Sequence, residues 1–176
     1  MEDRSRFLCD HMLGTLARWL RLLGYDTAYP GAREDAELLS TAEGEGRVLL
    51  TRDKDLAGRS GARGLYVASD DLDEQIRQVL TELRPRAKDP MSRCAVCNGV
   101  LHEATREAAR GAVPEGVWRR QEQFWRCTAC GQYYWRGTHW EHMRPRLDGY
   151  VALLEGEREG PPPPSERPAA RGPSKA

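Results

Sequence analysis

The sequence lacks both an excess of charge of one sign and any long apolar run. Its 176 residues carry 27 Lys and Arg against 27 Asp and Glu, whereas proteins that bind nucleic acid through their whole surface are usually strongly basic. No apolar run approaches the ~20 residues that cross a bilayer. No secretory leader follows the charged residues 1–6. We therefore expect a cytoplasmic protein that does not contact membranes.

Charge is distributed unevenly along the chain. Residues 1–90 hold 14 basic and 17 acidic side chains, residues 91–156 hold 9 and 7, and residues 157–176 hold 4 and 3. All cysteines but Cys9 and all tryptophans but Trp19 lie in the middle segment. The neutral total is thus an acidic first part balanced by a basic remainder, so any electrostatic contact with nucleic acid should be local to the second part.

These changes in composition predict three segments. An α/β domain is expected over 1–88 and a cysteine-containing module with a C-terminal helix over 91–155. The tail, 156–176, includes Pro161–Pro164 among Gly, Ser, Arg and Glu, and we expect it to be disordered because it has almost nothing to bury. With 39% hydrophobic residues, the rest of the chain can build a core, which excludes a wholly disordered protein.

The first ninety residues alternate between short apolar runs and segments of helical periodicity. The runs predict strands at 7–9, 27–29, 48–50 and 65–68. The periodic segments predict helices at 13–23, 35–42 and 72–83, with a very short helix near 55–59. Strands of three or four apolar residues that alternate with helices indicate a parallel sheet covered on both faces.

A carboxylate follows every predicted strand. Asp10 follows the first, Asp35 opens the helix after the second, Asp53 follows the third, and Asp70 with Asp71 follows the fourth. Because the carboxyl ends of parallel strands face one crevice, these side chains should lie on the same rim. Carboxylates gathered there would repel one another unless a cation intervenes, and oxygen ligands suit Mg²⁺ or Mn²⁺. A shared metal site is the prediction.

Each of these acids also has a simpler interpretation. Asp10, Asp35 and Asp70 stand just before helical patterns, where aspartate is favoured as an N-cap. Asp53 could be a turn residue, and the neighbouring Lys54 a solvated loop cation. Capping explains each residue separately but explains less well why every strand ends in an acid.

The four cysteines of the second part form two CxxC pairs. They are Cys94 with Cys97 and Cys127 with Cys130, with 29 residues between the pairs. Each pair suits one side of a tetrahedral structural zinc site. Two disulfides are the alternative, but they would leave Cys9, in a predicted strand, without a partner. Disulfides are also more typical of secreted proteins.

Two further features surround the cysteines. The gap between the pairs exceeds the common zinc-module spacing, so we expect an inserted loop around 107–115. Aromatic residues from 118 to 140 are interleaved with arginines such as Arg126 and Arg136, a combination that can stack bases and bind phosphates. The aromatics are equally suited to packing a small module that has few aliphatic residues. A helix should follow, with Trp140, Met143 and Leu147 facing inward.

Several of these motifs together resemble one known family. The stretches are Phe7–Gly14, Leu16–Asp26, Leu49–Lys54 and Ser69–Asp71, followed by the two cysteine pairs. In combination they resemble the Mut-seven C-terminal RNase domain, a branch of the PIN-like nucleases, over about residues 6 to 150. The resemblance implies a PIN-like fold, metal-dependent cleavage of RNA, and an acidic set at Asp10, Asp35, Asp53 and Asp70 or Asp71.

The resemblance leads to a mechanistic hypothesis. Asp10, Asp53 and Asp70 would hold Mg²⁺ or Mn²⁺, which lowers the pKa of a bound water and neutralises charge on the scissile phosphate. Asp35 or Asp71 would hold a second ion or orient the water, and Lys54 would contact the phosphate. The alternative is a non-catalytic zinc-ribbon adaptor that binds RNA or protein. The sequence identifies no particular protein partner, and RNA rather than DNA rests on the resemblance alone.

Overall fold

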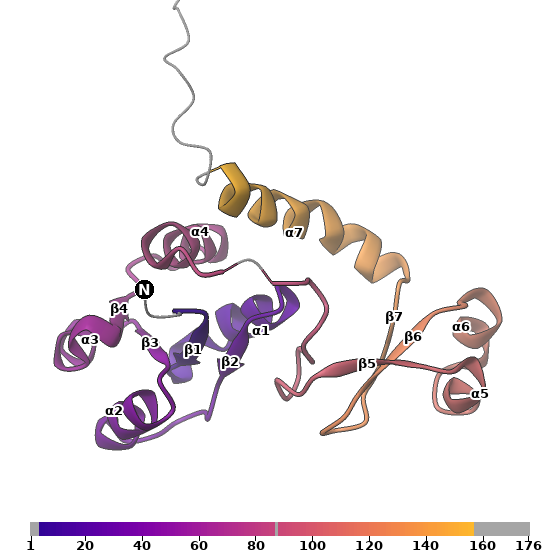
Figure 1. Cartoon of the computed structure of the whole chain (residues 1–176), viewed down its shortest axis with the longest axis horizontal. Helices are drawn as coiled ribbons and strands as arrows, with labels where there is room; N and C mark the ends of the chain where they lie inside the picture. The colour runs from indigo at the N-terminus through magenta and orange to yellow at the C-terminus, as the bar shows by residue number, and fades with distance from the viewer. Residues whose placement is uncertain (1–3, 87, 157–176) are drawn as a thin grey trace, which may run out of the picture.

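The chain folds into two sheets joined by a long C-terminal helix (Figure 1). The structure is a computed structural model that describes residues 4–86 and 88–156, without the side chain of His139. In Figure 1 the first sheet and its helices lie on the left, and the second sheet lies on the right. The tail for which disorder is predicted lies, from residue 157 on, outside the described residues.

The first sheet has four parallel strands in the order β2-β1-β3-β4. The strands are β1 (Arg6–Cys9), β2 (Asp26–Ala28), β3 (Val48–Thr51) and β4 (Gly64–Tyr66). The helices are α1 (Gly14–Leu22), α2 (Asp35–Gly44), α3 (Lys54–Arg59) and α4 (Leu72–Leu83), with 3-10 turns at His11–Leu13 and Gly61–Arg63. The predicted α/β class, a parallel sheet flanked by helices, is confirmed.

The central strands are buried on both faces, as their unbroken apolar runs require. Phe7 and Cys9 of β1 point to the side covered by α1 and α4. Leu8, between them, packs with Leu38 of α2 and Leu56 of α3 on the opposite side. The sheet therefore separates two apolar layers, the larger of which lies under α1 and α4.

The predicted order of elements in this half is confirmed, with small shifts at the strand ends. The second strand begins at Asp26, one residue earlier than expected, and α3 is as short as expected. Gly24 ends α1 at φ +90°, and a Cβ there would lie 2.4 Å from the backbone oxygen of Asp89. Only glycine fits this position, because it alone has no Cβ and adopts positive φ without strain.

The second sheet is antiparallel, with three strands in the order β5-β6-β7. They are β5 (Leu101–Ala104), β6 (Phe124–Cys127) and β7 (Tyr133–Trp135). The insertion expected around 107–115 is present, but the prediction that it is a loop is wrong. It contains two short helices, α5 (Arg106–Ala109) and α6 (Glu115–Arg120). These helices cover one face of the sheet, where Ala109 and Val113 bury the ring of Phe124.

Helix α7 (Thr138–Gly156) returns from the second sheet to the first half of the chain. Leu147, Tyr150 and Leu154 are buried in the large core under α1 and α4. Trp140 and Met143 pack against the same core, so the predicted inward face of this helix is confirmed. None of the described helices combines the length and the apolar composition that crossing a membrane requires.

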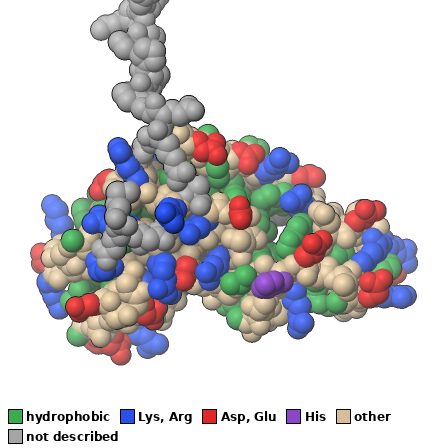
Figure 2. All heavy atoms as spheres, viewed as in Figure 1, with side chains coloured by type: hydrophobic (Ala, Val, Ile, Leu, Met, Phe, Trp, Pro, Cys, Tyr) green, Lys and Arg blue, Asp and Glu red, His purple; other side chains and the backbone are tan. Residues whose placement is uncertain are grey.

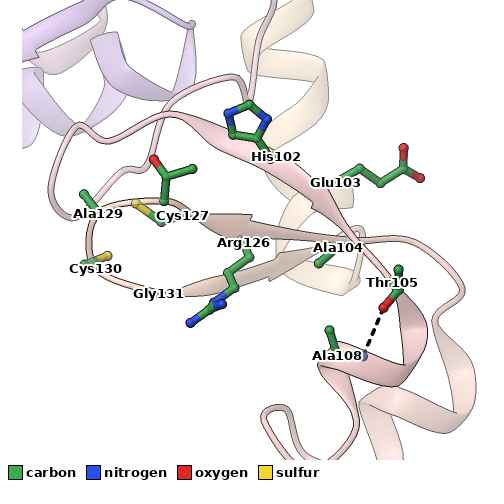
Figure 3. A pocket seen from close by; sticks show the side chains of 11 residues that line it. His102, Glu103, Ala104, Thr105, Ala108, Arg126, Cys127, Ala129, Cys130 and Gly131 are labelled. Atoms are coloured by element: carbon green, nitrogen blue, oxygen red, sulfur yellow. Dashed lines mark hydrogen bonds between the residues drawn. The ribbon is translucent and has the colours of Figure 1, made fainter.

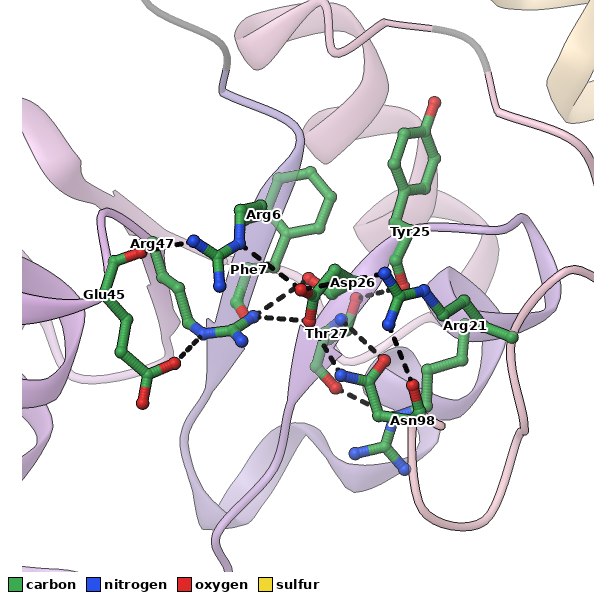
Figure 4. Close-up of polar contacts among 10 residues, drawn as sticks. Arg6, Phe7, Arg21, Tyr25, Asp26, Thr27, Glu45, Arg47 and Asn98 are labelled. Atoms are coloured by element: carbon green, nitrogen blue, oxygen red, sulfur yellow. Dashed lines mark hydrogen bonds and ion pairs between the residues drawn. The ribbon is translucent and has the colours of Figure 1, made fainter. Parts of the chain in front are cut away.

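A partly buried carboxylate lies where the two halves meet (Figure 4). Asp26, at the start of β2, accepts hydrogen bonds from Arg47 Nη1 at 2.7 Å and from Asn98 Nδ2 at 2.7 Å, and pairs with the exposed Arg6 at 3.3 Å. Desolvation favours the neutral acid, but the hydrogen bonds from Arg47 and Asn98 outweigh it and lower the pKa of Asp26 to about 2. Asp26 therefore stays ionised opposite an arginine that is itself almost fully buried.

The loop of the first cysteine pair is held against the open edge of β2. Asn98 Oδ1 accepts a hydrogen bond from the backbone N–H of Thr27 at 3.0 Å. The buried Arg21 of α1 donates to the carbonyl oxygens of Thr27, Ala95 and Val96 at 2.8, 3.2 and 2.9 Å. Polar groups that an edge strand would expose are thus satisfied by the cysteine module.

We expect Asp26→Asn to lower the free energy of unfolding by about 3 kcal/mol, because it removes the charge opposite the buried Arg47. Arg6→Gln removes a partner of the same carboxylate whose side chain is 47% exposed. It should cost less than about 1 kcal/mol. Urea unfolding followed by tryptophan fluorescence measures both. Equal losses for the two variants would contradict a dominant role for the buried pair.

Candidate metal centres

The four cysteines form one compact cluster between the two sheets. Cys94 and Cys127 are buried, Cys97 and Cys130 are exposed, and their sulfur atoms all lie within 4.8 Å of one another. The Sγ atoms of Cys94 and Cys130 are 3.7 Å apart, and those of Cys97 and Cys127 are 3.4 Å apart. Sulfurs placed about 2.3 Å from one zinc ion in a tetrahedron are about 3.8 Å apart. The donor set and its spacing fit zinc, and all the cysteines are free of disulfides.

Backbone N–H groups support these sulfurs. The N–H groups of Gly99 and Cys97 point at Cys97 Sγ and Cys94 Sγ at 3.4 and 3.5 Å. Burial raises the pKa of Cys127, but hydrogen bonds from the N–H groups of Cys130 and Ala129 outweigh it and lower that pKa to about 6. Because zinc binds thiolates, the turn prepares at least one ligand in its binding form near neutral pH.

Gly99 is required for the sulfurs to approach each other. A Cβ at this position would lie 2.7 Å from Cys127 Sγ and 2.9 Å from the Cβ of Ala129. Both distances are shorter than a van der Waals contact, so any larger residue would push the two cysteine turns apart.

A hollow of about 540 Å³ lies beside the second cysteine pair (Figure 3). β5, the start of α5 and the turn from Cys127 to Gly131 enclose it, and the side chain of Arg126 borders it. The hollow is open to solvent on the side of Cys130, whose side chain is exposed. A chelator or a competing metal can therefore reach the cluster from this side.

Cys9 belongs to neither the cluster nor the surface. It is fully buried in β1, and burial together with the neighbouring Asp10 raises the pKa of its thiol. As predicted, it packs as a small apolar residue.

The acidic rim begins with a buried carboxylate at the end of β1. Asp10 is 3% exposed. Its Oδ1 accepts the N–H of Met12 at 2.9 Å, and its Oδ2 accepts the N–H of Arg52 at 3.2 Å and the hydroxyl of Thr51. That hydroxyl in turn accepts the N–H of Asp53 at 2.9 Å. Asp10 is thereby held by the chain that leaves β3.

Asp53 and Asp70 extend this rim along the sheet. Asp53 is the N-cap of α3, and its Oδ1 accepts the N–H groups of Asp55 and Leu56 at 2.8 and 2.9 Å. Asp70, whose side chain is 81% exposed, pairs with Arg52. The ends of β1, β3 and β4 are thus linked through residues 51–53. Lys54 lies nearby, with Nζ 5.7 Å from the ring centre of Tyr66.

The other two predicted acids have separate partners. Asp35 lies in the first turn of α2 and pairs with Arg59 of α3 at 2.8 Å. The cap position of α2 is Glu34, so the N-cap interpretation of Asp35 is wrong. The N-cap interpretation of Asp70 is also wrong. The next residue, Asp71, caps α4 by accepting the N–H of Glu74 at 3.0 Å.

The carboxylates do not form a tight cluster. Within residues 4–86 and 88–156, the cysteines are the only group of three or more His, Cys, Asp or Glu whose ligand atoms lie within 4.8 Å of one another. The acids still offer oxygen ligands, because Asp53 Oδ2 accepts no hydrogen bond from any described residue and Asp10 Oδ1 accepts one. Such a donor set fits Mg²⁺ or Mn²⁺ retaining several waters better than it fits a closed protein cage.

Sequence reasoning missed Thr51 as a site residue. It is fully buried, and its hydroxyl joins Asp10 to the backbone of Asp53. The available signal was a polar residue at the end of the apolar run from Val48 to Leu50. A hydroxyl buried at a strand end needs a hydrogen-bond partner, and a preceding strand that ends in aspartate supplies one.

The fold and these two centres define an α/β protein with an acidic rim at the carboxyl end of a parallel sheet and a four-cysteine module consistent with a zinc ribbon. The profile of the Mut7-C RNAse domain family matches residues 5–147. The chain belongs to this family, as the sequence motifs predicted. Comparison with curated proteins and with solved structures finds no match to this chain.

We expect Gly99→Ala to lower zinc affinity by roughly 10- to 100-fold, because its Cβ separates the sulfurs. The control is Gly44→Ala at the end of α2, where a Cβ meets nothing within 4 Å. Competition with a chelating dye, on protein that contains about one zinc per chain, measures the difference. Equal affinities for the two variants would be incompatible with the sulfur cluster described above.

Thr51→Val should lower the free energy of unfolding by about 1–3 kcal/mol, because it leaves the N–H of Asp53 without its acceptor and removes one of the two donors to Asp10 Oδ2. Thr51→Ser keeps the hydroxyl and should lose only about 0.8 kcal/mol, as expected for one buried methyl group. Chemical denaturation measures both. A serine variant as unstable as the valine variant would assign the effect to packing rather than to the hydroxyl.

Proposed function

We propose that the protein is a divalent-metal-dependent ribonuclease that hydrolyses RNA phosphodiester bonds. The observation that carries the proposal is the buried Asp10 at the end of β1, linked through Thr51 to Asp53. Asp10 caps the 3-10 turn His11–Leu13, but a cap alone requires neither its burial nor its two further donors from Thr51 and Arg52 at the end of β3. Membership of an RNAse domain family supports the same conclusion.

Asp10, Asp53 and Asp70 are the proposed ligands of Mg²⁺ or Mn²⁺. Asp10 is a fixed ligand, whereas Asp53 is exposed and Asp70 is held only by Arg52. When bound, the metal lowers the pKa of a water and neutralises charge on the phosphate. Turning Asp70 toward the metal breaks an ion pair in which its side chain is 81% exposed, and such a pair is worth about 1 kcal/mol or less.

Cations beside the rim are proposed to bind the phosphate. Lys54 follows Asp53 directly, and its ammonium group is exposed apart from its contact with the ring of Tyr66. Arg52 pairs with Asp70, and a phosphate could replace that carboxylate as its partner. Asp35 and Asp71 are proposed to hold a second ion or to orient the water. Asp35 must first leave Arg59, and an exposed pair of this kind is worth about 1 kcal/mol or less.

Zinc has a structural role in this proposal. Residues 94–99 form one cysteine turn. Its Asn98 binds the edge strand β2, and its Ala95 and Val96 carbonyls accept hydrogen bonds from Arg21 of α1. We propose that the nuclease domain occupies 1–88 and the zinc ribbon 91–155. The metal then maintains the surface that joins them.

The second candidate function is a non-catalytic adaptor that binds RNA or protein through the ribbon. It is favoured by the ordinary structural partners of several acids, since Asp53 and Asp71 cap helices and Asp35 and Asp70 form ion pairs. The adaptor hypothesis does not explain why Asp10 is buried.

Cleavage of labelled single-stranded RNA in the presence of Mn²⁺ or Mg²⁺ tests the proposal. We expect Asp10→Asn and Asp53→Asn each to lower the rate by about a hundredfold or more, because a metal ligand supports several kcal/mol of transition-state stabilisation. The matched control is Asp55→Asn, an exposed acid in the first turn of α3, which should keep its activity.

Circular dichroism and zinc content confirm that the variants fold. Unchanged cleavage by Asp10→Asn would show that the nuclease assignment is wrong. RNA binding by the wild-type protein without cleavage under any divalent metal would favour the adaptor.

A further inference from the structure

A cleft of about 300 Å³ lies where the second sheet meets the start of α7. Trp125 of β6, Trp135 of β7 and Trp140 of α7 line it, together with Arg136 and Arg144. In Figure 1 this is the region where β7 passes directly into α7. The cleft is separate from both the acidic rim and the cysteine cluster.

The tryptophans of this cleft are only half-buried, although the module has other residues to fill its interior. Phe124 is fully buried under α5 and α6, and Leu101 with Cys127 fills the other face. Arg136 lies over the ring of Trp125, with its guanidinium carbon 5.2 Å from the ring centre. An exposed indole with a cation over its face offers a flat π-surface next to a positive charge.

The charges around the cleft favour an anionic occupant. Arg136 is exposed, and Arg144 has a side chain that is 66% exposed. Asp148, the one acid of the lining, pairs with Arg144 at 3.5 Å one helical turn away. An ion pair this exposed to solvent is weak, so a phosphate can compete for the arginine.

We propose that this cleft binds single-stranded RNA, with unpaired bases stacked on Trp125 and its neighbours and phosphates held by Arg136 and Arg144. This proposal rests on the proposed function, because the cleft would hold the RNA that the nuclease cleaves. Stacking requires unstacked bases, and a base-paired duplex does not offer them. Tryptophan faces beside arginines are the combination that binds such bases without selecting a sequence.

Helix α7 connects this cleft to the acidic rim. Arg146, six residues after Trp140, donates to Asp73 at 2.9 Å. Asp73 lies in the first turn of α4, which begins directly after Asp70 and Asp71. With a rise of 1.5 Å per residue, Trp140 and Arg146 are about 9 Å apart along the helix axis. A strand held in the cleft is therefore within a few nucleotides of the end of the sheet that carries the acids.

A second aromatic and basic group, on α5 and α6, is less suited to RNA (Figure 2, right end). The ring of Trp118 already lies against Arg106 and Arg110, at 4.4 and 5.3 Å. Its Nε1 donates to the carbonyl of Arg106, so two arginines and a hydrogen bond engage this indole, against the single Arg136 over the ring of Trp125. Arg119 of α6 is 70% exposed and pairs with Glu115 one helical turn away. In exposure and in pairing it closely matches Arg144, which pairs with Asp148.

The test uses the full chain with zinc retained, the Asp10→Asn substitution, and no added Mg²⁺ or Mn²⁺, so that binding is measured without cleavage. The probe is a fluorescein-labelled uridine 12-mer, and anisotropy gives Kd over a series of salt concentrations. We expect Trp125→Leu to weaken binding roughly tenfold or more. Arg136→Gln should weaken it and lower the salt slope by about 0.7, as expected for one phosphate contact on a single strand.

Arg119→Gln is the matched control and should leave Kd within about twofold of the parent. Equal losses for Arg119→Gln and Arg136→Gln would overturn the proposal, because binding would then be spread over all the arginines. So would preferential binding of a duplex, or cleft-dependent binding of an acidic peptide in place of RNA. Because Arg136→Gln changes only an exposed side chain, misfolding does not explain its effect.

This experiment separates the cleft from the nuclease. Cleft-dependent RNA binding by a wild-type protein that cleaves no RNA would refute the proposed function and support the cleft. Cleavage by a wild-type protein whose Trp125→Leu and Arg136→Gln variants bind and cleave like the parent would support the nuclease and refute the cleft.

Discussion

The ionised Asp26 is the contact on which the arrangement of the two halves depends. It neutralises the buried Arg47, which also donates to the carbonyl of Phe7 in the central strand β1. On its other side it binds Asn98, whose left-handed backbone at φ +71° is part of the first cysteine turn. Because zinc-binding free energy is folding free energy in small metal modules, a metal held by the cysteines would be energetically coupled to the first sheet through one carboxylate.

Much of the fold was predictable because its signals are local. Three- or four-residue apolar runs and periodic helices indicated a parallel sheet and the order of elements along the chain, but not the strand order within the sheet. The CxxC spacing indicated the cysteine cluster. The helices α5 and α6 were not predictable in the same way. They have 4 and 6 residues, which is too few turns for a periodic pattern. They are stabilised by apolar contacts around the buried Phe124, on one face of the second sheet.

The positions of the acids at the ends of the strands were predictable, but their partners were not. Strand ends identified Asp10, Asp53 and Asp70 because parallel strands share one carboxyl edge. Which acid caps a helix depends on a shift of one residue, as Asp71 in place of Asp70 shows. Which acid pairs with an arginine depends on side chains from distant segments, as for Asp35 with Arg59. Neither the capping residue nor the ion-pair partner can be predicted from the local sequence.

The position of α7 has a consequence for how the chain folds during synthesis. The large core under α1 and α4 is completed by Tyr150 and Leu154, the second of which emerges 71 residues after α4 ends at Leu83. At 5–20 residues per second, a ribosome takes about 4 to 14 s to add that length. Throughout this interval the first sheet and its helices expose an apolar face, so the second sheet is synthesised before α7 can cover that face.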